Sequence, residues 1–357
     1  MVVRRTAPEA AGEIRAAWDA GDAVLVLDPR APDAEVEGIV RRMQPGACVH
    51  PEVAALVVTS GTSGTPKGVE LTWDGLAASA AAIWDALQVG AGDRWLACLP
   101  LHYVAVLAVL GRAWAMGTPG TVLGGFDVAT VAAADATLVS LVPTMIRRLR
   151  DAGAETTTRF RRILLGGGPV RESGPNIVAT YGLTETWGGI VHDGYPLAGV
   201  ELSVGDDDEI LVRSPTVMRG YRTAPEETAA AFAAGGWLRT GDAGAIDAGG
   251  RLRVVDRLRD LVITGGVNVS PSEVEAVLAR HPAVADVCVV GAPDPEWGER
   301  VVAHVVARDP ASLPALAELR TFAAGELSAA KLPRQLVLTD RIPRTAGGKP
   351  LRRLLRG

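Results

Sequence analysis

Short apolar runs alternate with helical patterns along the front half of the chain. Apolar runs fall within residues 24–27, 54–58, 138–142 and 162–166, and their length and composition are typical of buried strands. The alanine-rich segment from Leu76 to Leu87 is interrupted by one aspartate and predicts a packed helix. This alternation predicts a mixed α/β fold with a largely parallel sheet.

The pattern changes in the second half of the chain. From about Glu201 it indicates a small antiparallel β subdomain that includes 209–213. A charged junction at 256–260 then precedes a tail with its own strand-helix-strand pattern. Because 357 residues exceed the usual size of one hydrophobic core, we expect a large domain over 1–256 and a smaller one over 257–357.

Charge and cysteine content narrow the class of protein. The net charge of -5 gives no general electrostatic reason to expect nucleic acid or an anionic membrane as partner. The three cysteines, Cys48, Cys98 and Cys288, lie far apart, so neither a disulfide framework nor a zinc site is indicated. No apolar signal core and no uncharged stretch long enough to cross a membrane occur, and we expect a cytoplasmic protein.

Hydroxyl groups and glycines are concentrated around a lysine between residues 59 and 68. Glycines let backbone N–H groups approach phosphate oxygens, hydroxyls donate hydrogen bonds, and the lysine adds charge. Pro66 and Gly68 occupy positions that a Walker A loop gives to glycine and a hydroxyl residue, so this is a different phosphate loop. A flexible linker is the alternative, but strand-like segments lie on both sides. The expected phosphate ligands are Thr59, Ser60, Gly61, Thr62, Ser63, Gly64, Thr65 and Lys67.

Four later segments are ambiguous when taken singly. The glycines of 166–169 suit a flat ring or a phosphate against the backbone, or an ordinary strand-ending turn. Residues 181–186 offer a carboxylate beside hydroxyls that suits magnesium, or a capped turn with a solvated glutamate. Residues 236–242 end in an aspartate suited to ribose hydroxyls, or form a β-turn. Lys349 follows two glycines, and a surface lysine is the simpler interpretation.

Taken in order, these motifs resemble those of the adenylate-forming acyl-CoA synthetases, adenylation domains and luciferases. The resemblance covers nearly all the chain from Leu56 onward and includes the 99–103 segment and the 256–275 region. It implies a large N-terminal domain of α/β layers with a small β subdomain, followed by a small mobile C-terminal α+β domain. The front end is short, because only about fifty residues precede the phosphate loop.

The resemblance also implies a role for each motif. Lys67 and the hydroxyls around it would hold the β- and γ-phosphates of ATP, Thr184 the α-phosphate and Glu185 the magnesium ion. Adenine would lie between Gly167, Gly168 and Tyr181. Asp242 would bind the ribose hydroxyls, Arg257 the ribose or phosphates, and Lys349 the attacking carboxylate and the α-phosphate. The catalytic residues would therefore be Thr184, Glu185 and Lys349.

The implied reaction has two steps, acyl-adenylate formation with release of pyrophosphate and thioester formation with CoA and release of AMP. A carboxylate needs no deprotonation at neutral pH, so bringing the anions together and stabilising charge at phosphorus suffices. The C-terminal domain would rotate between the steps and bring Gly265 and Gly266 to a pantetheine tunnel. Arg259 stands at the hinge position, where the family often has aspartate or lysine.

Within the family, segments 140–145, 164–169 and 181–194 are similar to the o-succinylbenzoate-CoA ligases of menaquinone synthesis, and the short front end is similar to actinobacterial members. His102, Tyr103 and Arg112 lie where the acid pocket is expected, and Arg112 suits a second carboxylate, although it could be a surface arginine on a helix. Residues 103–106 depart from the subgroup, where histidine and glycine are frequent.

The sequence leaves two alternatives open. The chain could activate another aryl or acyl acid, as a CoA ligase or a stand-alone adenylation enzyme, or it could bind adenylates without turnover. A homodimer is a common arrangement for such enzymes, but the sequence does not determine the oligomeric state.

Overall fold

The computed structural model describes residues 1–5, 7–46, 49–59, 66–153, 155–170, 172–344, 348 and 350–356. The chain divides into two compact units. Unit 1 comprises residues 1–203, 211–240 and 248–252, and unit 2 comprises residues 204–210, 241–247 and 253–357.

The first sheet of unit 1 contains the two strands that precede and follow the phosphate-loop motif. Its order is β1 (Val2–Val3), β2 (Val24–Val26), β3 (Val53–Thr59), β4 (Lys67–Thr72) and β14 (Gly220–Arg222). Helices α1 (Ala7–Asp19) and α2 (Asp33–Met43) connect the first three strands, which are parallel. The next pairs, β3 with β4 and β4 with β14, are antiparallel. The prediction of a largely parallel sheet therefore holds for β1 to β3 and is wrong for β4 and β14. The loop between β3 and β4 is too short for the crossover that parallel neighbours need.

The second sheet has the predicted parallel core. Its order is β11 (Tyr195–Pro196), β10 (Gly188–His192), β9 (Ile177–Leu183), β8 (Arg162–Leu165), β7 (Leu138–Leu141), β5 (Trp95–Ala97) and β6 (Gly120–Val122). From β6 to β9 the pairs are parallel, and β10 and β11 add antiparallel strands. Helix α3 (Trp73–Leu87) lies against β3 and β4 of the first sheet and against α4 (Val104–Ala115), which contacts β5, β6 and β10. The other helices of this region are α5 (Val128–Ala133), α6 (Pro143–Ala152) and α7 (Glu155–Thr158).

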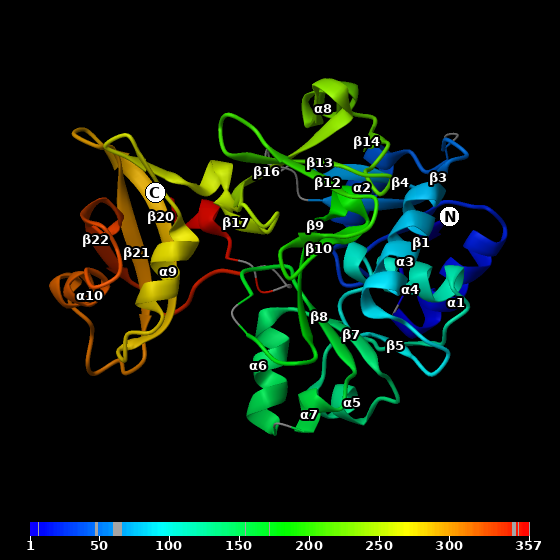
Figure 1. The fold of residues 1–357 in the computed structure, drawn as a ribbon, viewed down its shortest axis with the longest axis horizontal. Coiled ribbons are helices and arrows are strands. Elements are labelled where there is room, and N and C mark those ends of the chain that lie inside the picture. Colours follow the sequence, from blue (N-terminus) through cyan, green and yellow to red (C-terminus); the bar gives the residue numbers. More distant parts are fainter. Residues whose placement is uncertain are drawn as a thin grey trace. The chain divides into compact units, whose positions relative to one another are not determined.

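The helical crossovers of this sheet explain why its short strands are apolar. Parallel strands need helices over their faces, so both faces are buried and the strands are apolar throughout. Val139, Ile163 and Leu165 from the strands pack with Ile146 and Leu149 of α6 in one core. Figure 1 shows α5, α6 and α7 beside β7 and β8. The predicted helix at 76–87 is confirmed as α3, capped by Thr72, whose hydroxyl accepts from the Gly75 N–H.

The third sheet corresponds to the β region predicted from about Glu201. Its order is β12 (Glu201–Val204), β13 (Glu209–Arg213), β16 (Trp237–Ile246) and β15 (Phe232–Ala233), and β17 (Leu252–Arg257) also pairs with β16. Helix α8 (Pro225–Ala231) and the 3-10 turn η2 (Ala234–Gly236) precede β16. The strand prediction at 209–213 is confirmed as β13.

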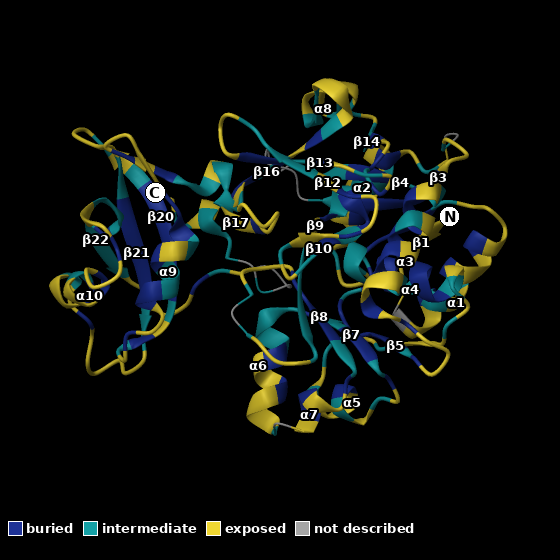
Figure 2. Ribbon diagram, viewed as in Figure 1, coloured by how far each residue is buried: buried dark blue, intermediate teal, exposed yellow. Residues whose placement is uncertain are grey.

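The fourth sheet belongs to unit 2. Its order is β19 (Val267–Val269), β18 (Val262–Thr264), β21 (Gly298–Ala307) and β20 (Val284–Asp294), and β22 (Gln335–Leu338) also pairs with β21. Helices α9 (Pro271–Leu278) and α10 (Leu316–Ala323) pack on it, with 3-10 turns η3 (Leu258–Asp260), η4 (Ala329–Lys331) and η5 (Arg352–Leu354). Its valine-rich core appears as the dark blue stretches of β20 and β21 in Figure 2.

Over the described residues, no helix has both the length and the apolar character needed to cross a bilayer.

Candidate active site

The phosphate-loop motif lies between β3 and β4 in unit 1. Thr59 ends β3 and Lys67 begins β4, and the two residues face each other across the antiparallel ladder. The loop residues between them, Ser60, Gly61, Thr62, Ser63, Gly64 and Thr65, lie outside the described residues. Lys67 is half-buried, and its ammonium group lies 4.9 Å from the centre of the Tyr221 ring.

Glu185 is held in a short 3-10 turn, η1 (Thr184–Thr186). The buried Thr186 hydroxyl accepts from the Leu183 N–H at 3.0 Å and donates to the Gly188 carbonyl at 2.8 Å. The turn is thus capped, as the simpler interpretation expected, but the glutamate is half-buried, and Tyr221 donates its hydroxyl to Glu185 Oε1 at 2.9 Å. This bond gives the carboxylate one fixed partner and leaves its second oxygen for another ligand.

Trp187 fixes the end of that turn. Its backbone has a φ of +55°, a left-handed conformation that is unfavourable for a bulky side chain. The indole is fully buried, and its Nε1 donates to the Thr72 carbonyl at 3.0 Å. Burial and this hydrogen bond hold the strained residue in place, and such strain is found at functional sites.

The glycine motif follows β8 as predicted. Gly167 has a φ of +77°, which a residue with a side chain seldom adopts. At Gly166 an added Cβ would lie 2.8 Å from the Thr180 carbonyl on β9. Since β8 and β9 pair in parallel, Gly167, Gly168 and Tyr181 all lie near the carboxyl ends of neighbouring strands, where ligands bind in open α/β sheets.

Asp242 lies in unit 2 inside the strand β16, so the β-turn interpretation is wrong. Gly241 has a φ of +69°, and its N–H donates to Glu209 Oε1 at 2.8 Å, so a local irregularity replaces the turn. The Asp242 carboxylate is buried and lies 2.8 Å from the Arg257 Nε atom. The two predicted ribose and phosphate ligands therefore lie together, and Glu209 is an additional buried carboxylate that the sequence did not single out.

The three expected acid-pocket residues lie at opposite ends of α4. Tyr103 caps its N-terminus, and its ring lies 4.5 Å from that of His102. His102 Nε2 is 4.0 Å from Asp28 Oδ2, and burial lowers the pKa of His102 although Asp28 opposes the shift. Arg112 is in the last turn of α4, roughly 13 Å further along the helix axis.

Arg112 is buried, so the surface-arginine alternative is wrong. Its guanidinium lies 5.1 Å from the Trp95 ring centre, its Nε has no hydrogen-bond partner, and no carboxylate among the described residues pairs with it. Burial lowers the pKa of Arg112 to about 10. A buried charge is costly without a partner, so this group is suited to an anion that the protein itself does not supply.

Two further buried polar groups accompany Arg112. His192 Nε2 on β10 and Thr180 Oγ1 on β9 also lack hydrogen-bond partners, and these two residues face each other across the strand ladder. Burial, and then the charge of Arg112, lower the pKa of His192 to about 4, so the imidazole is neutral at pH 7. Neither residue was predicted. A histidine and a threonine in otherwise apolar strands were the only signal.

In unit 2 the residues predicted for the hinge and for the CoA tunnel lie in turns. Arg259 lies in η3, and Gly265 and Gly266 join β18 to β19 with φ values of +58° and +77°. An added Cβ at Gly265 would lie 2.8 Å from the Trp297 ring, so the turn needs glycine for space as well as for conformation. Lys349 lies outside the described residues.

The chain next to Lys349 is anchored by Arg344. One Nη of this arginine lies 2.7 Å from Asp286 Oδ1, and the other donates to the Gly348 carbonyl at 2.8 Å. Gly348 is therefore tied to β20.

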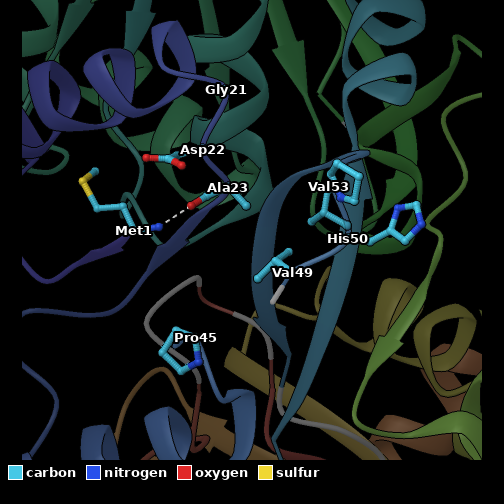
Figure 3. Close-up of a pocket in the computed structure, with 9 residues that line it drawn as sticks. Met1, Gly21, Asp22, Ala23, Pro45, Val49, His50 and Val53 are labelled. Carbon is cyan, nitrogen blue, oxygen red and sulfur yellow. Dashed lines mark hydrogen bonds between the residues drawn. The ribbon is translucent and has the colours of Figure 1, made fainter. Parts of the chain in front are cut away.

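A separate cavity of about 230 Å³ lies in unit 1 beside the N-terminus (Figure 3). It is lined by Met1, Gly21, Asp22, Ala23, Pro45, Val49, His50, Pro51 and Val53. Two of these residues contact each other, since the Met1 ammonium group donates to the Ala23 carbonyl. None of these residues is a predicted site residue.

Comparison with known proteins assigns the chain to a family. The family model for AMP-binding enzymes matches residues 47–222, and that for the AMP-binding enzyme C-terminal domain matches residues 273–349. A 2-succinylbenzoate–CoA ligase of Geobacillus kaustophilus is 36% identical, with 96% of this chain and 76% of the relative covered. The chain belongs to the AMP-binding enzyme family.

Other members of the family support the same placement. A "Probable 2-succinylbenzoate–CoA ligase" of Mycobacterium tuberculosis is 37% identical over 92% of this chain and 89% of its own length. The o-succinylbenzoate CoA synthetase of Bacillus subtilis, solved with an acyl-adenylate intermediate, superposes with a TM-score of 0.88 at 29% identity, covering 100% of this chain and 87% of that one. The same synthetase has also been solved with ATP and a magnesium ion.

The resemblance in sequence and the mixed α/β fold are thus confirmed. The chain is an AMP-forming acid–thiol ligase, and the alternative of an adenylate-binding protein without turnover is set aside. The predicted residue roles remain predictions.

Proposed function

We propose that the chain activates o-succinylbenzoate with ATP and transfers the acyl group to CoA, a step of menaquinone synthesis. The names of the relatives support this substrate. The buried and unpaired guanidinium of Arg112 is the observation that carries the proposal, since o-succinylbenzoate has a second carboxylate that needs a cationic partner.

In the first half-reaction an oxygen of the succinyl carboxylate attacks the α-phosphorus of ATP. The new C–O–P linkage forms as the bond to the β-phosphate breaks, and pyrophosphate leaves. Lys67 would hold the β- and γ-phosphates, and Thr184 and Lys349 would stabilise charge at the α-phosphate. Electrostatic stabilisation and alignment are what this step requires, because the nucleophile is already ionised.

Glu185 suits a magnesium ion. Magnesium is usually bound through one or two carboxylates together with substrate phosphates and water. Glu185 meets that requirement, because Oε1 accepts from Tyr221 while no hydrogen bond to Oε2 is present among the described residues. The bound ion would neutralise phosphate charge.

In the second half-reaction the CoA thiol releases its proton to solvent and its sulfur attacks the acyl carbon. The acyl–phosphate bond breaks and AMP leaves. Gly265 and Gly266 would form the turn that the pantetheine arm passes. The arm would approach the backbone at Gly266, where the space that a side chain would fill is open, because the Trp297 ring already covers Gly265.

Arg112 would bind the aryl carboxylate, with His192 and Thr180 beside it. Neutral imidazole and hydroxyl groups can donate hydrogen bonds without adding a further charge. A site built from buried polar groups discriminates strongly against a ligand that leaves them unpaired. We therefore expect o-succinylbenzoate to be preferred over acids with a single carboxylate.

ATP–pyrophosphate exchange with o-succinylbenzoate and a panel of aryl and fatty acids tests this function. CoA is then added, and the thioester is detected by mass spectrometry. We expect exchange and thioester with o-succinylbenzoate and little with monocarboxylic acids. Efficient exchange with another acid alone would keep the ligase chemistry and refute the substrate.

A further inference from the structure

Tyr221 lies between two residues that the proposed function assigns to ATP and magnesium. Its hydroxyl donates to Glu185 Oε1 at 2.9 Å, and the Lys67 ammonium lies 4.9 Å from the centre of its ring. The two parts of its side chain, a hydrogen-bond donor and an aromatic ring, thus contact two different partners. All three residues belong to unit 1.

The fold fixes Tyr221 through the backbone of β14. This strand pairs antiparallel with β4, so Tyr221 faces Val69, two residues after Lys67. The Tyr221 N–H donates to the Thr228 hydroxyl of α8 at 2.8 Å. The N–H of Met218 donates to the Glu185 carbonyl at 2.7 Å, which ties the segment before β14 to η1.

A buried carboxylate strengthens the pairing of β14 with β4. Glu70 on β4 is buried and accepts from Arg219 at 2.9 Å and from Arg222 at 3.3 Å, the residues that flank Gly220 and Tyr221. Two charge-assisted hydrogen bonds to one buried carboxylate hold the short strand in register. The backbone at Tyr221 is therefore fixed in place before a ligand binds.

We propose that Tyr221 is a positioning residue that sets the carboxylate of Glu185 for magnesium and the ammonium of Lys67 for the phosphates. This inference rests on the proposed function of those two residues. The hydroxyl restrains the Glu185 carboxylate and leaves Oε2 for the metal. The ring attracts the ammonium through the cation–π interaction and keeps it from pairing with Glu185 directly.

Two substitutions separate the two contacts. Tyr221→Phe keeps the ring and removes the hydroxyl, whereas Tyr221→Leu removes both. Tyr195→Phe is the matched control, because Tyr195 is exposed on β11. ATP binding is measured by calorimetry with and without magnesium, the magnesium dependence of pyrophosphate exchange is titrated, and thermal unfolding verifies the fold of each variant.

For Tyr221→Phe we expect the half-saturating magnesium concentration to rise about tenfold, with magnesium-free ATP binding unchanged. For Tyr221→Leu we expect the same rise and, in addition, roughly fivefold weaker ATP binding without magnesium. A Tyr221→Phe magnesium titration that matches the wild type would overturn the inference, as would equal weakening of metal-free ATP binding in both variants.

Glu185→Gln and Lys67→Ala distinguish this failure from failure of the proposed site. Suppose that Glu185→Gln needs more magnesium and Lys67→Ala binds ATP more weakly than the wild type, while Tyr221→Phe behaves as the wild type. Only the role of Tyr221 is then wrong. If Glu185→Gln and Lys67→Ala bind ATP and magnesium as the wild type does, the assignment of the site itself is wrong.

Discussion

The Nε of Arg257 lies 2.8 Å from Oδ1 of Asp242, so two residues predicted to bind the sugar and phosphates of ATP bind each other. A carboxylate can accept several hydrogen bonds through its two oxygens. Asp242 can therefore keep the arginine while it accepts from ribose hydroxyls. The pair orients the carboxylate before ATP arrives, and that preorganisation lowers the entropic cost of binding.

Asp242→Asn tests this arrangement. The amide removes the negative charge that orients Arg257, and it accepts weaker hydrogen bonds from the ribose hydroxyls. We therefore expect the KM for ATP to rise about tenfold to a hundredfold. Pyrophosphate exchange at varied ATP gives the measurement, and Asp206→Asn in an exposed loop of the same unit serves as control. An unchanged KM for ATP would exclude Asp242 from the nucleotide site.

Arg112→Met separates stability from function. Replacing a buried, unpaired charge by an apolar side chain of similar length should raise the free energy of unfolding by about 1–3 kcal/mol in the absence of acid. The same change should raise the KM for o-succinylbenzoate at least about tenfold, because a charged hydrogen-bond partner is lost. Denaturant unfolding and exchange kinetics measure the two effects. Arg148→Met, at an exposed position of α6, should change neither. An unaltered acid KM in Arg112→Met would count against the pocket.

His192 predicts a pH dependence of stability. Its pKa is about 4 in the folded protein, below the ordinary value of 6.5, so the unfolded state binds more protons between these values. The free energy of unfolding should therefore fall as the pH drops from about 6.5 to 4, by about 3 kcal/mol from this group. Urea unfolding at pH 7.5 and 4.5 should show a smaller loss for His192→Gln than for the wild type. The exposed His50→Gln control should retain the full loss, and equal losses in all three proteins would refute the assignment.

Lys349→Ala should abolish acyl-adenylate formation and leave thioester formation from preformed adenylate intact, since the lysine is proposed to act at the α-phosphate only. Arg344→Ala should slow the first step about tenfold, because the hydrogen bond to Gly348 and the pair with Asp286 are both lost. Single-turnover assays of each half-reaction give both rates, with Arg353→Ala on the exposed tail as control. Equal loss of both steps would contradict the proposed role of Lys349.

Several features followed from local sequence alone. The apolar runs and the helix α3 were predictable because side-chain periodicity reflects burial directly. The strands on either side of the phosphate loop followed for the same reason, and the order of the short motifs along the chain was sufficient to indicate the family. These are properties of neighbouring residues and of their order, which is why the sequence determined them.

Tertiary structure alone decided the rest. Asp242 stands beside a glycine, a local pattern typical of a turn, but pairing of β16 with β13 and β17 makes the segment a strand. Helix α4 is apolar on nearly every side, so its sequence does not show which face is buried. Only the structure shows that Arg112 is buried, with its guanidinium over the Trp95 ring. Tyr221 is far from Lys67 and Glu185 in the sequence. Pairing of β14 with β4 brings it to Lys67, and the Met218–Glu185 hydrogen bond brings η1 to the same strand. Long-range pairing and burial depend on the whole chain, so no local pattern of residues could determine them.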